Sequence, residues 1–260
     1  MSNFFTPAIM LRRVEYGDHD LILTFLTKAD GKISAIAKHA KKSVKRFAGV
    51  LELFSCLQIV CAASSKRGKP GGLAILKEAS ILDPFCEIRA DVVKTAYASY
   101  WAELINGWME SDVKNNAIYT LFLDALAAIA RRDKTERETS VIFQMKFLAE
   151  SGLTPNLAQC MVCHVGIDAI KSKEIGFNLE KGGLVCPVCA GTTAIHLHLS
   201  KGTVKQLLWI AEKTMAQAQR TRFSPTILEE STRLLEAFVP FHMGKEPKSL
   251  RFLRQLRRME

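Results

Sequence analysis

The sequence LILTFLTKADGKISAIA, residues 21–37, holds two apolar runs separated by the dipeptide Asp30-Gly31. Asp-Gly adopts positive φ at low cost, and between two apolar runs it is a strong signal for a β-hairpin. The flanking runs, Leu21–Thr27 and Ile33–Ala37, contain the β-branched residues that favour strands. This segment therefore predicts two antiparallel strands near the start of the chain.

Three further apolar runs extend the strand pattern around this hairpin, at Ala8–Val14, Leu53–Cys61 and Leu73–Leu82. Five short strands with a longer polar insert between the third and fourth fit a small barrel, and the OB fold is the commonest such barrel in a basic setting. An SH3-like barrel is the alternative. Asp83-Pro84 marks the boundary, because the residue before a proline disfavours the helical region. We expect an OB-fold nucleic-acid-binding domain over residues 1–84.

After this boundary the apolar residues repeat every four positions, which is typical of a helix with one buried face. The repeat comprises Ile88, Val92, Ala96, Tyr100, Leu104 and Trp108. Further helices are expected at Ala117–Arg131, Glu138–Glu150, Ser200–Ala218 and Pro225–Pro240. The predicted fold is multidomain α+β. Its helical domain has two parts, residues 85–158 and 198–260, which flank a small module at residues 159–197 and end in a basic helix.

Composition and missing motifs exclude several functional classes. Hydrophobic residues make up 48% and charged residues 24% of the 260 residues, an ordinary globular composition. The chain lacks an apolar run of about 18 residues and a secretory signal, so we expect a cytoplasmic protein with no membrane partner. It also lacks a Gly-rich phosphate loop, a Gly-x-Ser-x-Gly motif and a His-Glu-x-x-His motif. We therefore expect no enzymatic activity and no small-molecule substrate.

Four of the seven cysteines form two Cys-x-x-Cys pairs, Cys160 with Cys163 and Cys186 with Cys189. Two such pairs can supply four thiolates to one tetrahedral zinc ion. Gly182-Gly183 offers a hairpin turn that brings the second pair back to the first. Four sulfur ligands leave no position for water, so the predicted zinc is structural. Redox use of the cysteines is the alternative, although no βαβ pattern surrounds either pair.

The net charge of +10 favours a polyanionic partner, and its distribution is uneven. Residues 1–84 and 196–260 each carry +6, whereas residues 85–155 carry −2. We predict that the first domain binds DNA through basic groups that neutralise phosphates. These candidates are Arg12, Arg13, Lys38, Lys41, Lys42, Lys45, Arg46, Lys66, Arg67 and Lys69.

Aromatic residues on such barrels also stack on the bases of single strands. Phe47 directly follows Arg46 and is the best candidate, whereas Phe25 and Phe54 lie within apolar strands and are expected in the core. The remaining cysteines, Cys56, Cys61 and Cys86, are expected to be buried small hydrophobes. A basic run is often only a solvated face, and this is the alternative for the whole cluster.

The order of these parts resembles the RecO family of bacterial recombination mediators over essentially the whole chain. The matching residues begin with Tyr16-Gly17 and the run from Leu26-Thr27 to Gly31, followed by the basic stretch to Arg46-Phe47. Further matches are Phe147-Leu148 through Pro155 into Cys160 and Cys163, then Gly182 to Cys186, and finally Lys248-Ser249-Leu250-Arg251.

The resemblance implies a non-enzymatic DNA repair and recombination protein located with the nucleoid. It implies binding of single- and double-stranded DNA, annealing of complementary strands, and loading of recombinase onto strands coated by single-strand-binding protein (SSB). RecR and the acidic, apolar-ended tail of SSB are the implied partners. Our candidates for the tail are Arg131, Arg132 and Lys134. The alternative function is a zinc-ribbon RNA-binding or ribosome-associated module, and a redox enzyme ranks third.

Overall fold

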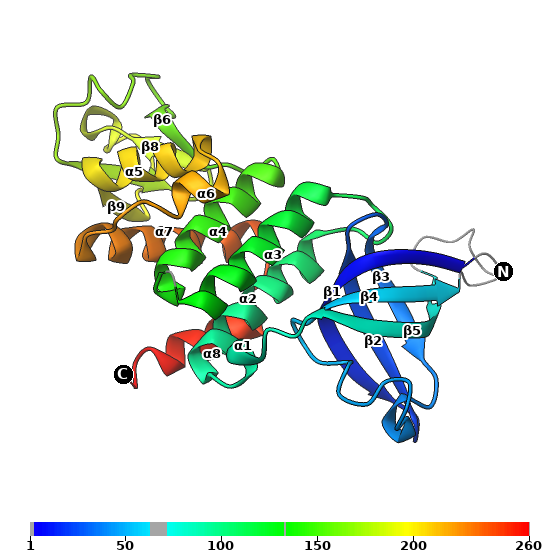
Figure 1. Ribbon diagram of the computed structural model, residues 1–260. Helices are drawn as coiled ribbons and strands as arrows, with labels where there is room; N and C mark the ends of the chain where they lie inside the picture. The colour runs from blue at the N-terminus through cyan, green and yellow to red at the C-terminus, as the bar shows by residue number, and fades with distance from the viewer. Residues whose placement is uncertain (1–2, 63–71, 133, 260) are drawn as a thin grey trace. The chain divides into compact units, whose positions relative to one another are not determined.

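The computed structural model describes residues 3–62, 72–132 and 134–259 (Figure 1). The chain forms two compact units. The first comprises Met1–Asp133 together with Pro247–Glu260, and the second comprises Lys134–Glu246. The first unit therefore takes residues from both ends of the sequence, and the second is inserted between them.

The first unit begins with five strands, which are β1 (Asn3–Tyr16), β2 (Asp20–Thr27), β3 (Gly31–Ala37), β4 (Cys56–Ala62) and β5 (Ala74–Asp83). They form a closed barrel in the order β1-β2-β3-β5-β4, and β4 pairs back to β1. The β3–β5 pair is parallel. The predicted five-stranded, OB-type barrel is confirmed, including the hairpin at Asp30-Gly31.

Strand alternation fills the barrel with apolar side chains, among them Met10, Phe25 and Ile59. The hairpin requires glycine at position 31, where φ is +70° and a Cβ would lie 2.1 Å from the carbonyl oxygen of Val113. The fourth strand begins later than the predicted Leu53. Phe54 has a positive φ of 67°, which is incompatible with strand geometry, so β4 starts at Cys56.

The helices of the first unit are α1 (Cys86–Arg89), α2 (Val92–Trp108), α3 (Asn116–Arg131) and α8 (Lys248–Leu256). Asp91 caps α2 by accepting hydrogen bonds from the amides of Val93 and Lys94. Asn115 caps α3 in the same way. The C-terminal helix α8 packs on α2, which carries the fully buried Tyr100 and Trp101.

The second unit combines helices with a small sheet. Its helices are α4 (Glu136–Glu150), α5 (Lys201–Glu212), α6 (Met215–Ala218) and α7 (Pro225–Met243). The sheet has the order β6-β8-β7-β9, formed by β6 (Asn156–Cys160), β7 (Glu174–Asn178), β8 (Gly183–Val185) and β9 (Leu197–Ser200). The single helix predicted for Ser200–Ala218 is wrong, because Thr214 starts a new helix with a capping box to Gln217.

Among the described residues, no helix is both long enough and apolar enough to cross a membrane.

Candidate metal centre and nucleic-acid interface

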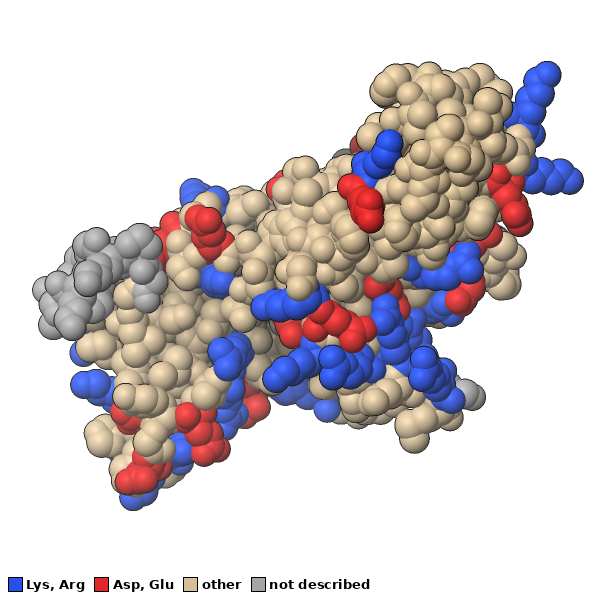
Figure 2. Space-filling view, turned by 180° about the vertical axis from the view of Figure 1, so that it is seen from behind, with Lys and Arg blue, Asp and Glu red and all other residues tan. Residues whose placement is uncertain are grey.

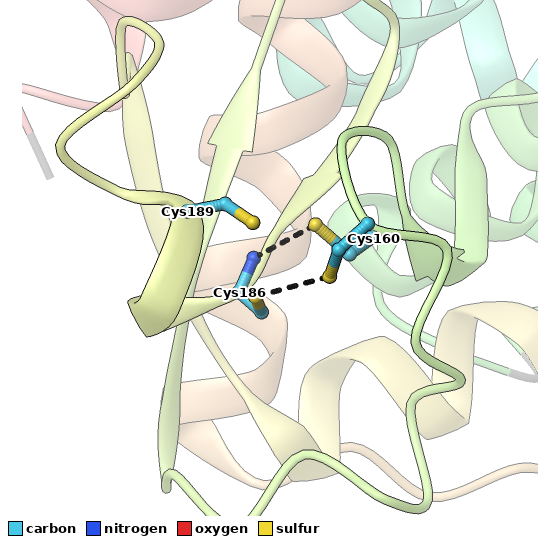
Figure 3. A group of neighbouring side chains, drawn as sticks. Cys160, Cys186 and Cys189 are labelled. Atoms are coloured by element: carbon cyan, nitrogen blue, oxygen red, sulfur yellow. Dashed lines mark hydrogen bonds between the residues drawn. The ribbon is translucent and has the colours of Figure 1, made fainter.

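Two turns bring the four paired cysteines together in the second unit. Cys160 ends β6, and Cys186 directly follows β8, which pairs with β6. Gly182, with a φ of 67°, turns the chain from β7 into β8, so the predicted hairpin is confirmed. The Sγ atoms of Cys160, Cys163, Cys186 and Cys189 all lie within 4.8 Å of one another. Their sulfur atoms converge in Figure 3, where three of them are labelled.

Backbone amides stabilise negative charge on the first of these sulfurs. The amides of Cys186 and Val162 donate to Cys160 Sγ over 3.3 and 3.4 Å. Burial raises the pKa of Cys160, but these hydrogen bonds outweigh it and lower the pKa to about 6. The pKa of Cys189 is raised to about 12, first by burial and then by the neighbouring thiols. One thiolate forms readily here, and a bound cation would favour the others.

The cluster could therefore hold a metal ion through four sulfur atoms. Amide donors to a thiolate at the end of a Cys-x-x-Cys turn, together with the four-sulfur donor set, fit zinc. His164 and His196 are not needed as ligands, and His196 Nδ1 already accepts a hydrogen bond from the amide of Leu179 over 3.2 Å. Cys56 and Cys61 are buried as predicted, but the burial predicted for Cys86 is wrong, because its side chain is exposed at the start of α1.

The basic segment, residues 38–46, follows β3 at one end of the barrel. Lys38, Lys42 and Lys45 are exposed there. Lys41 is also exposed, but its ammonium lies 2.7 Å from the carboxylate of Glu15, and this hydrogen bond and charge lower the pKa of Glu15. Figure 2 shows Lys and Arg side chains interleaved with Asp and Glu on one face of the molecule. Three lysines of the segment are thus better placed than Lys41 to meet phosphates.

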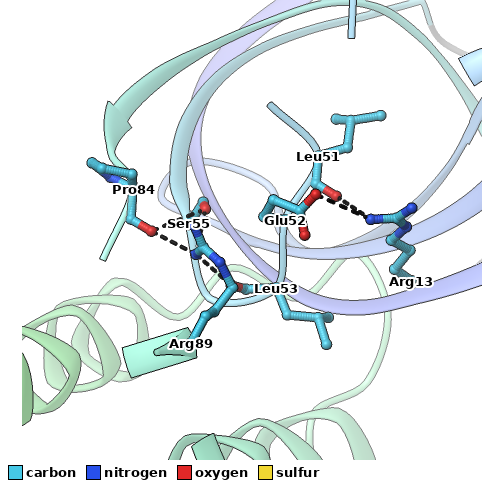
Figure 4. A network of polar contacts seen from close by, with 7 residues as sticks. All are labelled: Arg13, Leu51, Glu52, Leu53, Ser55, Pro84 and Arg89. Atoms are coloured by element: carbon cyan, nitrogen blue, oxygen red, sulfur yellow. Dashed lines mark hydrogen bonds and ion pairs between the residues drawn. The ribbon is translucent and has the colours of Figure 1, made fainter. Parts of the chain in front are cut away.

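Two arginines hold the loop that precedes β4 (Figure 4). Arg13 donates to the carbonyl oxygen of Leu51 over 3.1 Å and to the carboxylate of Glu52 over 3.3 Å. From the other side, Arg89 Nη1 donates to the carbonyl oxygens of Leu53 and Pro84. The guanidinium of Arg13, a predicted DNA contact, is therefore engaged in holding this loop. Arg12, which directly precedes Arg13 in β1, is exposed.

The burial of Phe47 does not support the stacking role predicted for it. Phe47 is only 3% exposed and belongs to the barrel core together with Phe25, and Phe54 is also buried. The guanidinium of Arg46 lies 4.4 Å from the centre of the Phe47 ring and donates to the carbonyl oxygen of Lys38. Both residues therefore fix the shape of the basic segment. Phe47 also helps to line a pocket of about 280 Å³ beside it.

A partly exposed apolar row crosses the outside of the barrel, and the sequence patterns described above did not predict it. Val14 pairs with Ile22, Ile22 with Ile36, and Ile36 with Ile75, so the four side chains share the outer face. Val14 is 37% exposed, and Tyr16, two positions further along β1, is 56% exposed. Strand alternation places Arg12, Val14 and Tyr16 on this same face. The outer face of these strands is where OB folds bind oligonucleotides.

The other predicted site residues are the basic residues between β4 and β5 and the three candidates for the SSB tail. Lys66, Arg67 and Lys69 lie outside the described residues. Arg131 ends α3 in the first unit, and Arg132 follows it with a positive φ of 60° and an exposed side chain. Lys134 belongs to the second unit, where its ammonium pairs with Glu138 and donates to the carbonyl oxygen of Thr221. Lys134 is thus engaged within its own unit.

Known proteins match the chain over nearly its whole length. The family model described as Recombination protein O N terminal matches residues 1–85, and that described as Recombination protein O C terminal matches residues 89–251. A DNA repair protein RecO from Desulfatibacillum aliphaticivorans is 44% identical over 97% of each chain. Another, from Desulfosudis oleivorans, is 41% identical over 99% of each chain. The chain belongs to the RecO family.

The RecO assignment agrees with the architecture described above. The barrel and its basic segment lie within the N-terminal match, and the four-cysteine cluster lies within the C-terminal match. The relatives are named as DNA repair proteins, which supports a role in DNA repair and gives no support to the RNA-binding alternative. Helix α8 continues past residue 251, where the RecO C-terminal match ends.

Proposed function

We propose that this RecO-family protein binds single-stranded DNA on the outer face of its barrel and acts without catalysis. The observation that carries the proposal is the apolar row Val14–Ile22–Ile36–Ile75, with the exposed ring of Tyr16 beside it. Apolar and aromatic surface accepts unpaired bases whatever their sequence, because every base has a π-face. The surface therefore suits single strands, whose bases are not stacked in a duplex.

The cations near this row complete the binding surface. Arg12 lies on the same face of β1, and Lys38, Lys42 and Lys45 follow β3. Such groups neutralise phosphates and carry no base information, so binding has little sequence preference. A strand held by its phosphates and by the flat faces of its bases keeps the base edges free to pair with a complementary strand. This supports annealing of complementary DNA. The double-stranded product is then a second ligand of the same protein.

The second unit contributes the zinc site as a fold clamp. One zinc ion on the four cysteines would tie β6 to the turn after β8, in a segment whose own core is small. Zinc closed off by four thiolates stabilises structure and supplies no reaction chemistry. This agrees with a protein that acts by binding.

The resemblance to recombination mediators supplies the remaining partners, RecR and the acidic tail of SSB. Arg131, Arg132 and Lys134 are the candidate contacts for the tail. Arg132 is preferred because its exposed side chain directly follows α3, whereas the ammonium of Lys134 is engaged with Glu138 and Thr221. In this role the protein works on chromosomal DNA, at the nucleoid, and helps to load recombinase onto SSB-coated strands.

Fluorescence anisotropy with a labelled oligothymidylate tests the proposal directly. We expect tight binding at low salt, weaker binding to an oligouridylate of equal length, and loss of affinity when Tyr16 and Lys42 are replaced by alanine together. Replacement of the exposed Lys28, at the other end of β2, serves as the control. Unchanged affinity in the Tyr16 and Lys42 variant would remove the outer face of the barrel as the binding surface.

A further inference from the structure

The last described segment of the chain carries a concentrated positive charge that the proposed function does not use. Residues 247–259 contain five Lys or Arg and no Asp or Glu. Helix α8 spans most of this segment, and Lys and Arg side chains gather around the C-terminal end in Figure 2. The cations are Lys248, Arg251, Arg254, Arg257 and Arg258.

Burial divides α8 into two faces. Leu250 and Leu253 are completely buried and attach the helix to the first unit. The opposite face presents Lys248 and Arg251, both exposed, with Phe252 beside them at 49% exposure, and the exposed Arg258 lies in the turn that follows the helix. A rise of 1.5 Å per residue places Lys248 and Arg251 about 4.5 Å apart along the helix axis, and Arg258 extends the basic segment beyond the end of the helix. This exposed face therefore combines a line of cations with an aromatic ring.

The helix is also held rigidly at its start. Its N-cap residue, Pro247, provides no side-chain cap. Glu103 of α2 takes this role and accepts hydrogen bonds from the amides of Lys248 and Ser249 over 3.1 and 2.9 Å. A buried face and an external cap keep the backbone of the helix in a constant position under its outer side chains. Binding to such a surface costs less ordering than binding to a flexible tail.

We propose that the exposed face of α8 is a second binding surface for single-stranded DNA, distinct from the barrel. Guanidinium groups match phosphate geometry with two parallel hydrogen bonds, and Phe252 offers a stacking face for a base. An acidic peptide without apolar residues would use the cations alone, whereas a nucleic acid also uses the aromatic ring beside them. The inference rests on the proposed function, because the barrel holds the first strand and α8 holds the second.

Counting bound strands tests this inference. A labelled oligothymidylate is titrated against the full-length protein at low salt and at concentrations far above the dissociation constant, so that saturation gives strands per chain. We expect two strands for the wild type and one for the variant Lys248→Gln with Arg258→Gln. Phe252→Ala should weaken the second strand about tenfold or more. Lys28→Gln, which removes an exposed cation outside α8, is the control, and circular dichroism confirms that each variant is folded.

Each outcome separates this inference from the proposed function. Two strands per chain in the Lys248 and Arg258 variant would overturn the role of α8. If that variant still bound two strands but no longer bound a poly-glutamate peptide, α8 would be assigned to an acidic protein partner. This result would also overturn the proposed DNA-binding role of α8. A parallel variant, Lys42→Ala with Lys45→Ala, reports on the barrel alone. If that variant retains both strands at full affinity, the barrel surface fails while the result for α8 still stands.

Discussion

Glu103 and Ser249 lie 146 positions apart in the sequence, yet two hydrogen bonds join them. The amide of Ser249 donates to the Glu103 carboxylate over 2.9 Å, and its hydroxyl donates to the same oxygen over 2.5 Å. A carboxylate at the N-terminus of a helix satisfies free amides and interacts favourably with the helix dipole. This pair caps the last helix, which Leu250 and Leu253 attach to the first unit by burial.

The first prediction concerns this cap. Glu103→Gln removes the negative charge but keeps the shape of the side chain, and we expect it to lower the free energy of unfolding by about 1–2 kcal/mol. The loss should be concentrated in α8, where amide hydrogen exchange becomes faster. Ser249→Ala should add little in the Glu103→Gln background. Glu110→Gln, at an exposed position after α2, is the control. If Glu103→Gln and Glu110→Gln lowered the free energy of unfolding equally, the assigned role of Glu103 would be contradicted.

Salt dependence distinguishes the lysines of the basic segment. Lys42→Ala with Lys45→Ala should flatten the slope of log affinity for single-stranded DNA against log salt by about 1.4, or 0.7 for each lost phosphate contact. Lys41→Ala should change the slope less than Lys42→Ala alone or Lys45→Ala alone, because Lys41 is paired with Glu15. Anisotropy titrations at several salt concentrations measure these slopes. A larger effect from Lys41 would show that DNA displaces Glu15.

Aromatic substitutions separate stacking from packing. Tyr16 is exposed, so Tyr16→Ala should leave stability within about 0.5 kcal/mol of the wild type while weakening DNA binding about tenfold. Phe47 is buried, so Phe47→Ala should cost about 3–5 kcal/mol of stability. Urea denaturation and anisotropy on the same samples provide both measurements. The reverse pattern would restore Phe47 as the stacking residue.

Acid should weaken the second unit through Glu230. Burial raises the pKa of this carboxyl group, but hydrogen bonds from Thr203 and Ser200, and the nearby charge of Arg233, outweigh it and hold the pKa below its usual 4.5. Because the folded pKa is the lower one, the carboxylate stabilises the fold above about pH 4.5, and this contribution is lost as the pH falls through the folded value.

Glu230→Gln should therefore be less stable than the wild type at neutral pH, and the difference should narrow as the pH falls below 4.5. Urea denaturation as a function of pH measures this difference. Glu212→Gln, at the exposed end of α5, is the control and should show no such narrowing. A constant difference at all pH values would mean that Glu230 acts through packing alone.

Metal analysis tests the cysteine cluster. Protein purified without added metal should contain one zinc per chain, and chelation should lower the melting temperature of the second unit. Cys186→Ser should lose the metal and the stability together. The exposed Cys86 lies outside the cluster, so Cys86→Ser should retain both. Metal-free protein with unchanged melting behaviour would leave the cysteines without a structural role.

Local signals predicted the barrel hairpin and the metal cluster well, because each depends on a few neighbouring residues. Asp30-Gly31 defines its own turn, and the Cys-x-x-Cys spacing already places two thiols on one site. The burial of Phe47 could not be predicted from its neighbours in the sequence. It follows a basic residue, and only the path of the chain over the barrel end turns its ring inward.

Tyr16 was missed for a different reason. Alternation along β1 puts it on the same face as Arg12 and Val14, so the signal was present. Its place beside the apolar row of the proposed binding surface depends on the pairing of β1 with β2, β2 with β3 and β3 with β5, and the last of these pairs joins distant segments. The cap that Glu103 of α2 gives to α8 is likewise set by contacts between distant segments, and no local pattern in either helix predicts that partner.

The division of the first unit between both ends of the sequence has a consequence for synthesis. A chain emerging from the ribosome presents the barrel and α1–α3 first, then all of the second unit, and α8 only afterwards. Until then, the surface of α2 that receives Leu250 and Leu253 stays uncovered. The inserted second unit can thus be complete before the first is, and a nascent chain stopped near residue 246 would present an apolar surface that chaperones and proteases recognise.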